Sequence, residues 1–310
     1  MKIIKNFYNI NRTAQNSVLT LGNFDGIHLG HQEILKILRQ IAANNGLKSA
    51  LLTFEPHPLT IINPAHNKAM RIIDLEQKLH FLQENNLVDL VFIADFNSQL
   101  ANLSAEDFVK KILVDHLKIK HLVVGYDFVF GKNRGGNIAT LEHLAKIYDF
   151  NLTKIAAYKD KKNHIYSSSL IRKFISEGDV KSANSILGRH FEINGIVISG
   201  NQMGEKLGFP TANLKPKTDI IKPKYGIYKA MVKLAENKII HKAVVSFGVR
   251  PTFGDGQQPL FEAHIFDFAD DLYGQKITIE LIDFIRQEKK FASEKALKKE
   301  MENDCVIAKN

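Results

Sequence analysis

Cysteine is almost absent from this chain of 310 residues. The single cysteine, Cys305, excludes a disulfide within the chain and a zinc site built from several cysteines. The simpler interpretation of Cys305 is a small, partly apolar side chain on a helix.

Long apolar runs are lacking as well. The first twelve residues contain no continuous apolar stretch of the length found in signal peptides, and no later window is apolar enough to span a membrane. We therefore expect a cytoplasmic protein without a membrane partner. Hydrophobic residues still make up 45% of the chain, which is enough to bury two sizeable cores.

Acidic residues are the minority charge, with 33 against 42 basic residues and a formal net charge of +9. Such a balance suits a protein that handles nucleic acid or polyphosphate ligands. The densest basic segments, residues 159–162 and 215–224, lack the interleaved aromatic residues on which single strands stack. We interpret both segments as solvated loops and expect no nucleic-acid partner.

The first half of the chain has the pattern of a parallel α/β sheet. Short apolar runs alternate with helical periodicity, which is typical of strands joined by crossover helices. The predicted strands cover residues 17–21, 50–54, 88–93, 121–125 and 152–157. The predicted helices lie after residue 31 and near residues 74–86, 104–118 and 139–149.

The second half reads differently. After two short helical segments, and a join near residues 187–190, successive strand-like runs predict an antiparallel barrel or sandwich. The runs cover residues 191–198, 225–234, 239–247, 260–266 and 277–284. One amphipathic helix is predicted at residues 293–308.

The most informative segment is GNFDGIHLGH at residues 22–31, where an apolar strand turns into a helix. His28 and His31 lie at the predicted helix start, where free N–H groups and the helix dipole favour anions. The small Gly30 lets a phosphate approach the backbone closely. Two surface histidines that cap a turn would be the better interpretation of an isolated H-x-G-H. The strand, glycines and helix around it favour a nucleotide site.

Three more clusters follow predicted strands, where open α/β sheets bind their ligands. FEPHP at residues 54–58 either points His57 into the cleft or forms a rigid turn, and the sequence does not choose between these. Residues 125–136 combine aromatic faces, a carboxylate and glycines that suit a flat heteroaromatic ligand. SSSLIR at residues 167–172 begins a helix with hydroxyls and the Arg172 guanidinium. Together with the histidines, this helix start predicts the far side of a triphosphate site.

The second half contains a glycine-bearing segment, GIVISGNQMGEKLGFPTAN, at residues 195–213. It is not a Walker-A loop, but its glycines recur every four residues and their backbone amides could wrap around phosphates. Thr211 and Asn213 offer neutral oxygen ligands to Mg²⁺. Glycines in β-turns would explain the spacing, but they do not explain P-T-A-N.

Four motifs of the first half occur in a specific order: G-N-F-D-G-x-H-x-G-H, F-E-P-H-P, G-x-D-F-x-F-G and S-S-S-x-I-R. Together they resemble the adenylyltransferase half of the bacterial bifunctional riboflavin kinases and FMN adenylyltransferases, the FAD synthetases. In the second half, the segments at residues 208–213, 246–253, 261–264, 271–274 and 285–291 resemble the kinase half. The resemblance implies a Rossmann-like nucleotidyltransferase domain at residues 1–186, then a riboflavin kinase β-barrel domain with a C-terminal helix at residues 187–310.

The resemblance also implies roles for residues of the first half. His28 and His31 would stabilise charge on the α-phosphate of ATP, and Ser168 with Arg172 would hold the β- and γ-phosphates. Asp127 and Phe128 would hold the isoalloxazine of FMN. The implied nucleotide-binding residues are Gly22, Asn23, Phe24, Gly30, Ser168 and Ser169.

In the second half, the resemblance makes Glu262 the base that accepts the proton of the riboflavin 5′-hydroxyl. Without it, Glu262 would be interpreted as an outward charge on a strand. Thr211 and Asn213 would hold Mg²⁺ and the phosphates. The implied nucleotide-binding residues are Gly200, Gly204, Lys206, Gly208 and Thr211, and the implied flavin-binding residues are Arg286, Glu288 and Phe291.

The chain departs from the family pattern at two places. Ser169 stands where the family usually has threonine, which keeps the hydroxyl, and Ser246-Phe247 stands where Asn-Ile is common. We expect riboflavin, FMN and ATP as substrates, and a weak homo-oligomer stays open.

Two other functions compete with this one. A related nucleotidyltransferase could act on pantetheine or nicotinamide nucleotides, against which P-T-A-N and Glu262 argue. A flavin-sensing or nucleic-acid-binding protein without turnover is the second, and the intact His28, His31, Glu262 and Arg172 argue against it.

Overall fold

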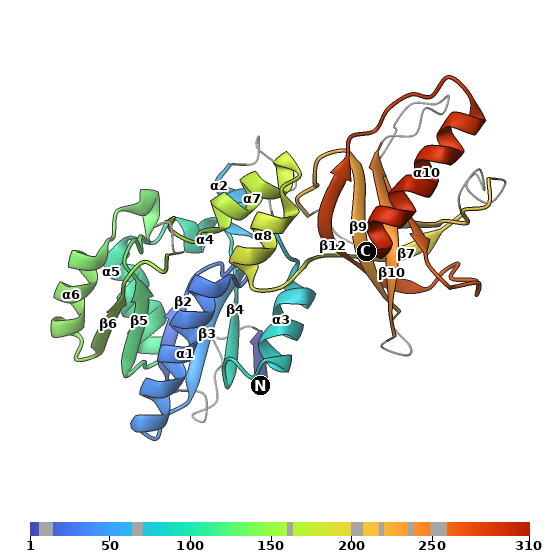
Figure 1. Cartoon of the computed structure of the whole chain (residues 1–310). Coiled ribbons are helices and arrows are strands. Elements are labelled where there is room, and N and C mark those ends of the chain that lie inside the picture. Colours follow the sequence, from blue (N-terminus) through green and yellow to red (C-terminus); the bar gives the residue numbers. More distant parts are fainter. Residues whose placement is uncertain are drawn as a thin grey trace. The chain divides into compact units, whose positions relative to one another are not determined.

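The computed structural model describes residues 1–5, 15–63, 71–159, 164–199, 207–216, 220–234, 239–248 and 259–310. The chain forms two compact units (Figure 1). The first consists of Met1–Lys68 and Asp74–Ser167, and the second of Ala69–Ile73 and Ser168–Asn310. Among the described residues, no helix is both long enough and apolar enough to cross a membrane.

The first unit contains a six-stranded sheet with all strands parallel, in the order β1-β4-β3-β2-β5-β6. The strands are β1 (Lys2–Lys5), β2 (Val18–Leu21), β3 (Ser49–Glu55), β4 (Leu90–Asp95), β5 (His121–Gly125) and β6 (Asn151–Ile155). The five predicted strands are confirmed within a few residues, and the edge strand β1 is additional. The chain leaves β2 toward β3 on one side, whereas β5 pairs with β2 on the other. This change of direction places the loops after β2 and β5 at one edge, where such sheets bind ligands.

The helices of the first unit are α1 (Leu29–Asn44), α2 (Pro58–Ile62), α3 (Leu75–Glu84), α4 (Ser98–Ala101), α5 (Ala105–Asp107), η4 (Phe108–His116) and α6 (Ile138–Ile147), with a 3-10 turn at Lys132–Arg134. α1 buries Leu35, Leu38 and Ala42 and packs against β2 and β3. The predicted helix at residues 104–118 is one α-helical turn followed by the π-helix η4. Its apolar face joins the core of the sheet.

The second unit begins with α7 (Ser168–Glu177) and α8 (Val180–Leu187) and continues as a closed antiparallel barrel, followed by α10 (Glu294–Lys309). The barrel order is β10-β11-β8-β7-β12-β9, and β9 pairs with β10 to close it. Its strands are β7 (Phe191–Ile198), β8 (Ala212–Pro216), β9 (Gly226–Leu234), β10 (Ile240–Gly248), β11 (Leu260–Ile265) and β12 (Lys276–Arg286).

The barrel follows from the alternation of its side chains. Every second residue of β9 is buried, the pattern of a strand with one face toward a core. Inside, the rings of Phe247 and Phe261 stack with centroids 4.2 Å apart, and Tyr228 is fully buried. The five predicted strands and the terminal helix are confirmed, while β8 adds a sixth strand at the P-T-A-N segment.

Candidate active sites

The turn between β2 and α1 has an unusual backbone. Gly22, Phe24, Gly26 and Ile27 all have positive φ angles, of 151°, 45°, 81° and 39°. Phe24 and Ile27 carry side chains, for which this conformation is unfavourable and is held only by surrounding structure. Both side chains are buried, with 5% and 0% of their surface exposed. Their packing therefore fixes the turn that leads into α1.

His28 is the N-cap of α1. Its Nδ1 accepts a hydrogen bond from the backbone N–H of His31 at 3.3 Å, and its ring stacks on the His31 ring with centroids 3.7 Å apart. A Cβ at Gly30 would lie 3.1 Å from His28 Nδ1 and 3.4 Å from the Cβ of Tyr158. Glycine at this position thus leaves room for the His28 ring.

The His31 ring contacts two other rings, because its centroid lies 3.7 Å from that of His28 and 4.6 Å from that of Phe24. Its Nδ1 is shielded from solvent and has no hydrogen-bond partner in the described part of the chain. Burial, together with the charges of His28 and Lys78, holds the pKa of His31 well below its ordinary value. His31 is therefore a neutral imidazole at pH 7.

Two polar side chains that the sequence did not single out support this turn. Lys78 in α3 is only 7% exposed, and its Nζ donates to the backbone carbonyl of Asn23 at 2.6 Å and to Thr53 Oγ1 at 3.2 Å. Thr53 Oγ1 also donates to the Asn23 carbonyl, at 3.4 Å. Lys78 lies in a helix that was predicted, but the sequence does not show that this lysine faces inward.

A cavity of about 820 Å³ opens at the same edge of the sheet. It brings together predicted residues from two separate motifs, Gly22 and Asn23 after β2 and Asp127 and Phe128 after β5. The remaining wall is largely apolar and aromatic and includes Leu59, Ile62, Phe54, Phe96 and Phe130. Such a cavity suits a flat, mostly apolar ring system.

His57 does not point freely into this cavity. Its Nδ1 accepts a hydrogen bond from the backbone N–H of Leu59 at 3.2 Å, and the side chain is 8% exposed. Of the two interpretations of FEPHP, the structure favours the rigid turn, in which His57 caps α2.

The predicted phosphate residues of S-S-S-x-I-R lie in the first turns of α7, which begins at Ser168. Ser168, Ser169 and Arg172 thus stand at a helix start as expected, within the second compact unit. Their approach to the phosphates beside His28 and His31 stays a prediction.

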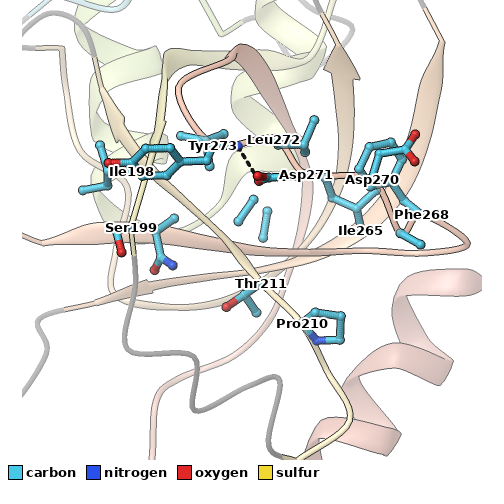
Figure 2. Close-up of a pocket in the computed structure, with 15 residues that line it drawn as sticks. Ile198, Ser199, Pro210, Thr211, Ile265, Phe268, Asp270, Asp271, Leu272 and Tyr273 are labelled. Carbon is cyan, nitrogen blue, oxygen red and sulfur yellow. Dashed lines mark hydrogen bonds between the residues drawn. The ribbon is translucent and has the colours of Figure 1, made fainter.

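The barrel has a first pocket of about 390 Å³ between the end of β7, the start of β8 and the loop after β11. Figure 2 shows Pro210 and Thr211 on one side of this pocket and Leu272 and Tyr273 across from them. Asp271 Oδ1 accepts a hydrogen bond from the backbone N–H of Tyr273 at 2.8 Å, which shapes that side (Figure 2).

A second barrel cavity, of about 720 Å³, is lined by Glu262, Arg286, Glu288 and Phe291. Thr211 lines both cavities. In the β8–β11 pairing, Asn213 stands directly opposite Glu262. The structure therefore brings the predicted metal ligands beside the predicted base, and puts the predicted flavin-binding residues into the cavity that this base faces.

Glu288 forms a second carboxylate in this cavity. Burial raises its pKa, as does the nearby charge of Glu262, while a hydrogen bond from Ser246 and the charge of Arg286 oppose the shift. Ser246 Oγ lies 3.4 Å from Glu288 Oε1, so this departure from the family pattern contributes a donor. A Cβ at Gly248 would lie 2.1 Å from the same oxygen.

Arg286 connects β12 to α10. Its Nε donates to Asp304 Oδ1 at 2.8 Å and its Nη2 to Asp304 Oδ2 at 2.6 Å, a two-point ion pair. Asp304 is 4% exposed and was not anticipated, because nothing in the sequence pairs these two positions. Four residues of α10 line the cavity: Leu297, Met301, Asp304 and Cys305.

The donor chemistry of the barrel site fits Mg²⁺. The hydroxyl of Thr211 and the side-chain oxygen of Asn213 are hard oxygen donors next to the Glu262 carboxylate. Within the described ranges, no group of three His, Cys, Asp or Glu side chains could hold a metal instead. Gly208 has a positive φ of 88°, while the predicted nucleotide residues Gly200, Gly204 and Lys206 lie outside the described residues.

Comparison with known proteins finds two families that match successive parts of the chain. Residues 10–169 match the FAD synthetase family and residues 187–310 match the riboflavin kinase family. The bifunctional riboflavin kinase/FMN adenylyltransferase of Buchnera aphidicola (from Schizaphis graminum) is 36% identical over 310 residues, covering 100% of this chain and 98% of the relative. That of Haemophilus influenzae is 38% identical over 309 residues, with the same coverage.

A similar solved structure comes from Streptococcus pneumoniae and is described as a macrolide-efflux protein. It is 31% identical, covers 100% of this chain and 99% of its own, and superposes with a TM-score of 0.89. The full-length relatives and both matched families agree, and the chain therefore belongs to the bifunctional riboflavin kinase/FMN adenylyltransferase family.

Proposed function

We propose that the chain converts riboflavin and ATP to FMN in its barrel, and FMN and a second ATP to FAD at the sheet. The observation that carries the proposal is the position of Thr211 in the walls of both barrel cavities. A residue shared by two adjoining cavities suits a group that passes from a donor in one to an acceptor in the other.

In the kinase step, ATP occupies the smaller barrel pocket and riboflavin the larger cavity. Glu262 accepts the proton of the ribityl 5′-hydroxyl, whose oxygen attacks the γ-phosphorus while ADP leaves. Thr211 and Asn213 hold Mg²⁺, which neutralises phosphate charge when bound. Gly200, Gly204, Lys206 and Gly208 contact the nucleotide.

The flavin ring lies in the larger cavity. Phe291 offers an aromatic face, Glu288 bonds polar atoms of the ring, and Arg286 lines the same wall. Because burial raises the pKa of Glu288, this side chain can hold a proton closer to neutral pH than an exposed carboxylate can.

In the adenylyl transfer, a phosphate oxygen of FMN attacks the α-phosphorus of ATP and pyrophosphate leaves. His28 and His31 face the α-phosphate and stabilise the charge that develops there. Since His31 is neutral, it acts as a hydrogen-bond donor through one N–H. Ser168, Ser169 and Arg172 hold the β- and γ-phosphates.

The other predicted residues complete this second site. Gly22, Asn23, Phe24 and Gly30 form the nucleotide loop, and Asp127 with Phe128 hold the isoalloxazine in the cavity of about 820 Å³. The shared wall of that cavity, with nucleotide-loop residues on one side and flavin residues on the other, supports this arrangement.

We also propose a domain boundary at residue 187, where the riboflavin kinase match begins. By packing, α8 goes with the barrel, since the Asn184 side chain bonds the Leu281 carbonyl and the Phe191 N–H at 2.8 Å each. The helices α7 and α8 thus precede the proposed domain boundary in the sequence, whereas their packing contacts assign them to the second compact unit. A cytoplasmic location stays a prediction of the sequence.

The test is an assay of the purified chain with riboflavin, ATP and Mg²⁺, in which riboflavin, FMN and FAD are separated by chromatography. We expect both FMN and FAD, and no product after chelation of the metal. FMN without FAD would contradict the adenylyl transfer, and no product at all would favour a flavin-binding protein. A parallel assay with pantetheine phosphate or nicotinamide mononucleotide in place of FMN should give no adenylylated product.

A further inference from the structure

Lys78 is a buried lysine beside the predicted adenylyl-transfer site. With 7% of its surface exposed, its ammonium has lost most of its hydration, which is unfavourable unless strong bonds replace the water. Two of these bonds go to the Asn23 carbonyl at 2.6 Å and to Thr53 Oγ1 at 3.2 Å. The charge is thus directed at the backbone of the turn that carries the histidines.

The Asn23 carbonyl is a point of convergence. It accepts from Lys78 in α3 and from Thr53 in β3, and it lies between two residues with positive φ, Gly22 and Phe24. A turn in this conformation relaxes unless surrounding structure holds it. The hydrogen bonds from two neighbouring elements are such a restraint, and they act five residues before His28.

The helix that carries Lys78 is itself held at its start. Asp74 caps α3 by accepting from the Gln77 N–H at 2.7 Å, and the Gln77 side chain accepts from the Asp74 N–H at 3.0 Å. This reciprocal cap fixes the turn of helix immediately before Lys78. The lysine therefore reaches the Asn23 carbonyl from a rigid base.

We propose that Lys78 is a positioning residue for adenylyl transfer: its ammonium holds the Asn23 carbonyl, and through it the turn that sets His28 and His31 beside the α-phosphate. The inference rests on the proposed function. Small displacements of such a turn are costly, because a misplacement of about 1 Å can slow a reaction by about a hundredfold.

The same charge has a second effect. The positive Lys78 adds to burial and to His28 in lowering the pKa of His31. A neutral side chain that only filled the space of Lys78 would not have this effect on the pKa of His31. The titration of His31 therefore reports, independently of activity, whether the Lys78 charge acts at the histidine.

The experiment compares Lys78→Met, which keeps most of the length, with Lys78→Gln, which keeps a donor but no charge. Lys36→Met, at an exposed position of α1, is the matched control. We expect Lys78→Met to lower the kcat of FAD formation from supplied FMN by about tenfold or more, with FMN formation unchanged. Lys78→Gln should recover part of the rate, and both variants should raise the His31 pKa measured by NMR titration.

Several results would overturn the inference. A folded Lys78→Met with an unchanged rate of FAD formation is one, and an unchanged His31 titration is another. If Lys78→Met does not fold, FAD formation is measured in Thr53→Val and Lys78→Gln instead. An unchanged rate in both of these variants overturns the inference. Failure of the proposed function looks different, because the unmodified chain would then make no FAD from FMN.

Discussion

At the scale of single residues, the sequence predicts part of the backbone conformation of the β2–α1 turn, and side-chain packing determines the rest. Glycines at positions 22 and 26 indicate a turn, and both have positive φ. Phe24 and Ile27 have the same sign of φ, which nothing in their residue type favours. Their conformation comes from burial of their side chains, and a sequence pattern does not contain that information.

Gly30 offers a test at this scale. In Gly30→Ala the new Cβ would press on His28 Nδ1, 3.1 Å away, and on Tyr158. We expect FAD formation from FMN to fall by about tenfold or more, because the His28 ring must move. FMN formation should be unchanged.

Chromatography of both products checks this, with the exposed Lys36→Ala in the same helix as control. An unchanged rate of FAD formation in Gly30→Ala would show that the His28 position is unimportant.

The lowered pKa of His31 predicts a pH dependence of stability. In the unfolded chain this histidine binds a proton near its ordinary pKa of about 6.5, whereas in the folded chain it stays neutral to lower pH. The unfolded state thus binds more protons in that window, so His31 makes folding less favourable as pH falls below about 6.5.

Urea unfolding of the chain, measured at intervals of about half a pH unit between roughly pH 5 and 8, tests this effect. The difference in unfolding free energy between the unmodified chain and His31→Gln should shrink as pH is lowered. A difference that is constant with pH would contradict a depressed His31 pKa.

At the scale of elements, most of the fold follows from periodicity. All ten predicted strands are present, as are the helices around residues 29–46, 74–86 and 139–149. The edge strand β1 was missed because its four residues include two lysines and give no apolar run. β8 was missed because it is short and starts within P-T-A-N, whose polar residues indicate a loop. The π-helix η4 buries Phe108, Val109, Ile112 and Leu113, a spacing that an α-helix fits equally well.

The candidate sites divide in the same way. Residues next to glycines and strand ends, such as His28 and Asp127, stand out because their motifs are local. Lys78 bonds Asn23, Ser246 bonds Glu288, and Asp304 bonds Arg286. The fold brings together these partners, which lie 18 to 55 positions apart in the chain. Sequence spacing alone cannot identify such partners.

The tie between β12 and α10 gives a prediction for an element. Removing one partner of a buried ion pair is strongly destabilising, by about 3 kcal/mol or more. In Asp304→Asn the Arg286 guanidinium loses its two-point carboxylate and keeps a carboxylate contact only with Glu300, at 3.3 Å, so the attachment of α10 to the cavity wall is weakened. We expect a higher KM for riboflavin and a lower urea midpoint of the barrel, with FAD formation from supplied FMN unchanged.

The control is Glu302→Gln, an exposed position on the same helix. If Asp304→Asn binds riboflavin as the unmodified chain does in calorimetric titration, α10 does not need this tie to form the cavity.

At the scale of the whole molecule, two compact units each carry a cavity system of their own. The two proposed reactions should therefore be separable by single substitutions, because no residue of one set of catalytic groups belongs to the other. His31 lies in the first unit and Glu262 in the second.

His31→Ala should make FMN from riboflavin but no FAD. Glu262→Ala should make no FMN, yet convert supplied FMN to FAD. An equal mixture of the two variants should form FAD from riboflavin, because FMN released by one serves the other. If either folded variant lost both reactions, the assignment of two sites would be wrong.

The position of α10 also bears on synthesis of the chain. The sheet unit uses no residue beyond Ser167, whereas the larger barrel cavity takes part of its wall from Leu297, Met301 and Cys305 in α10. Domains fold as units during translation, N-terminal first. A nascent chain that has not yet produced α10 can thus form its sheet but cannot close its flavin cavity, so kinase competence begins only once α10 has been made and has folded.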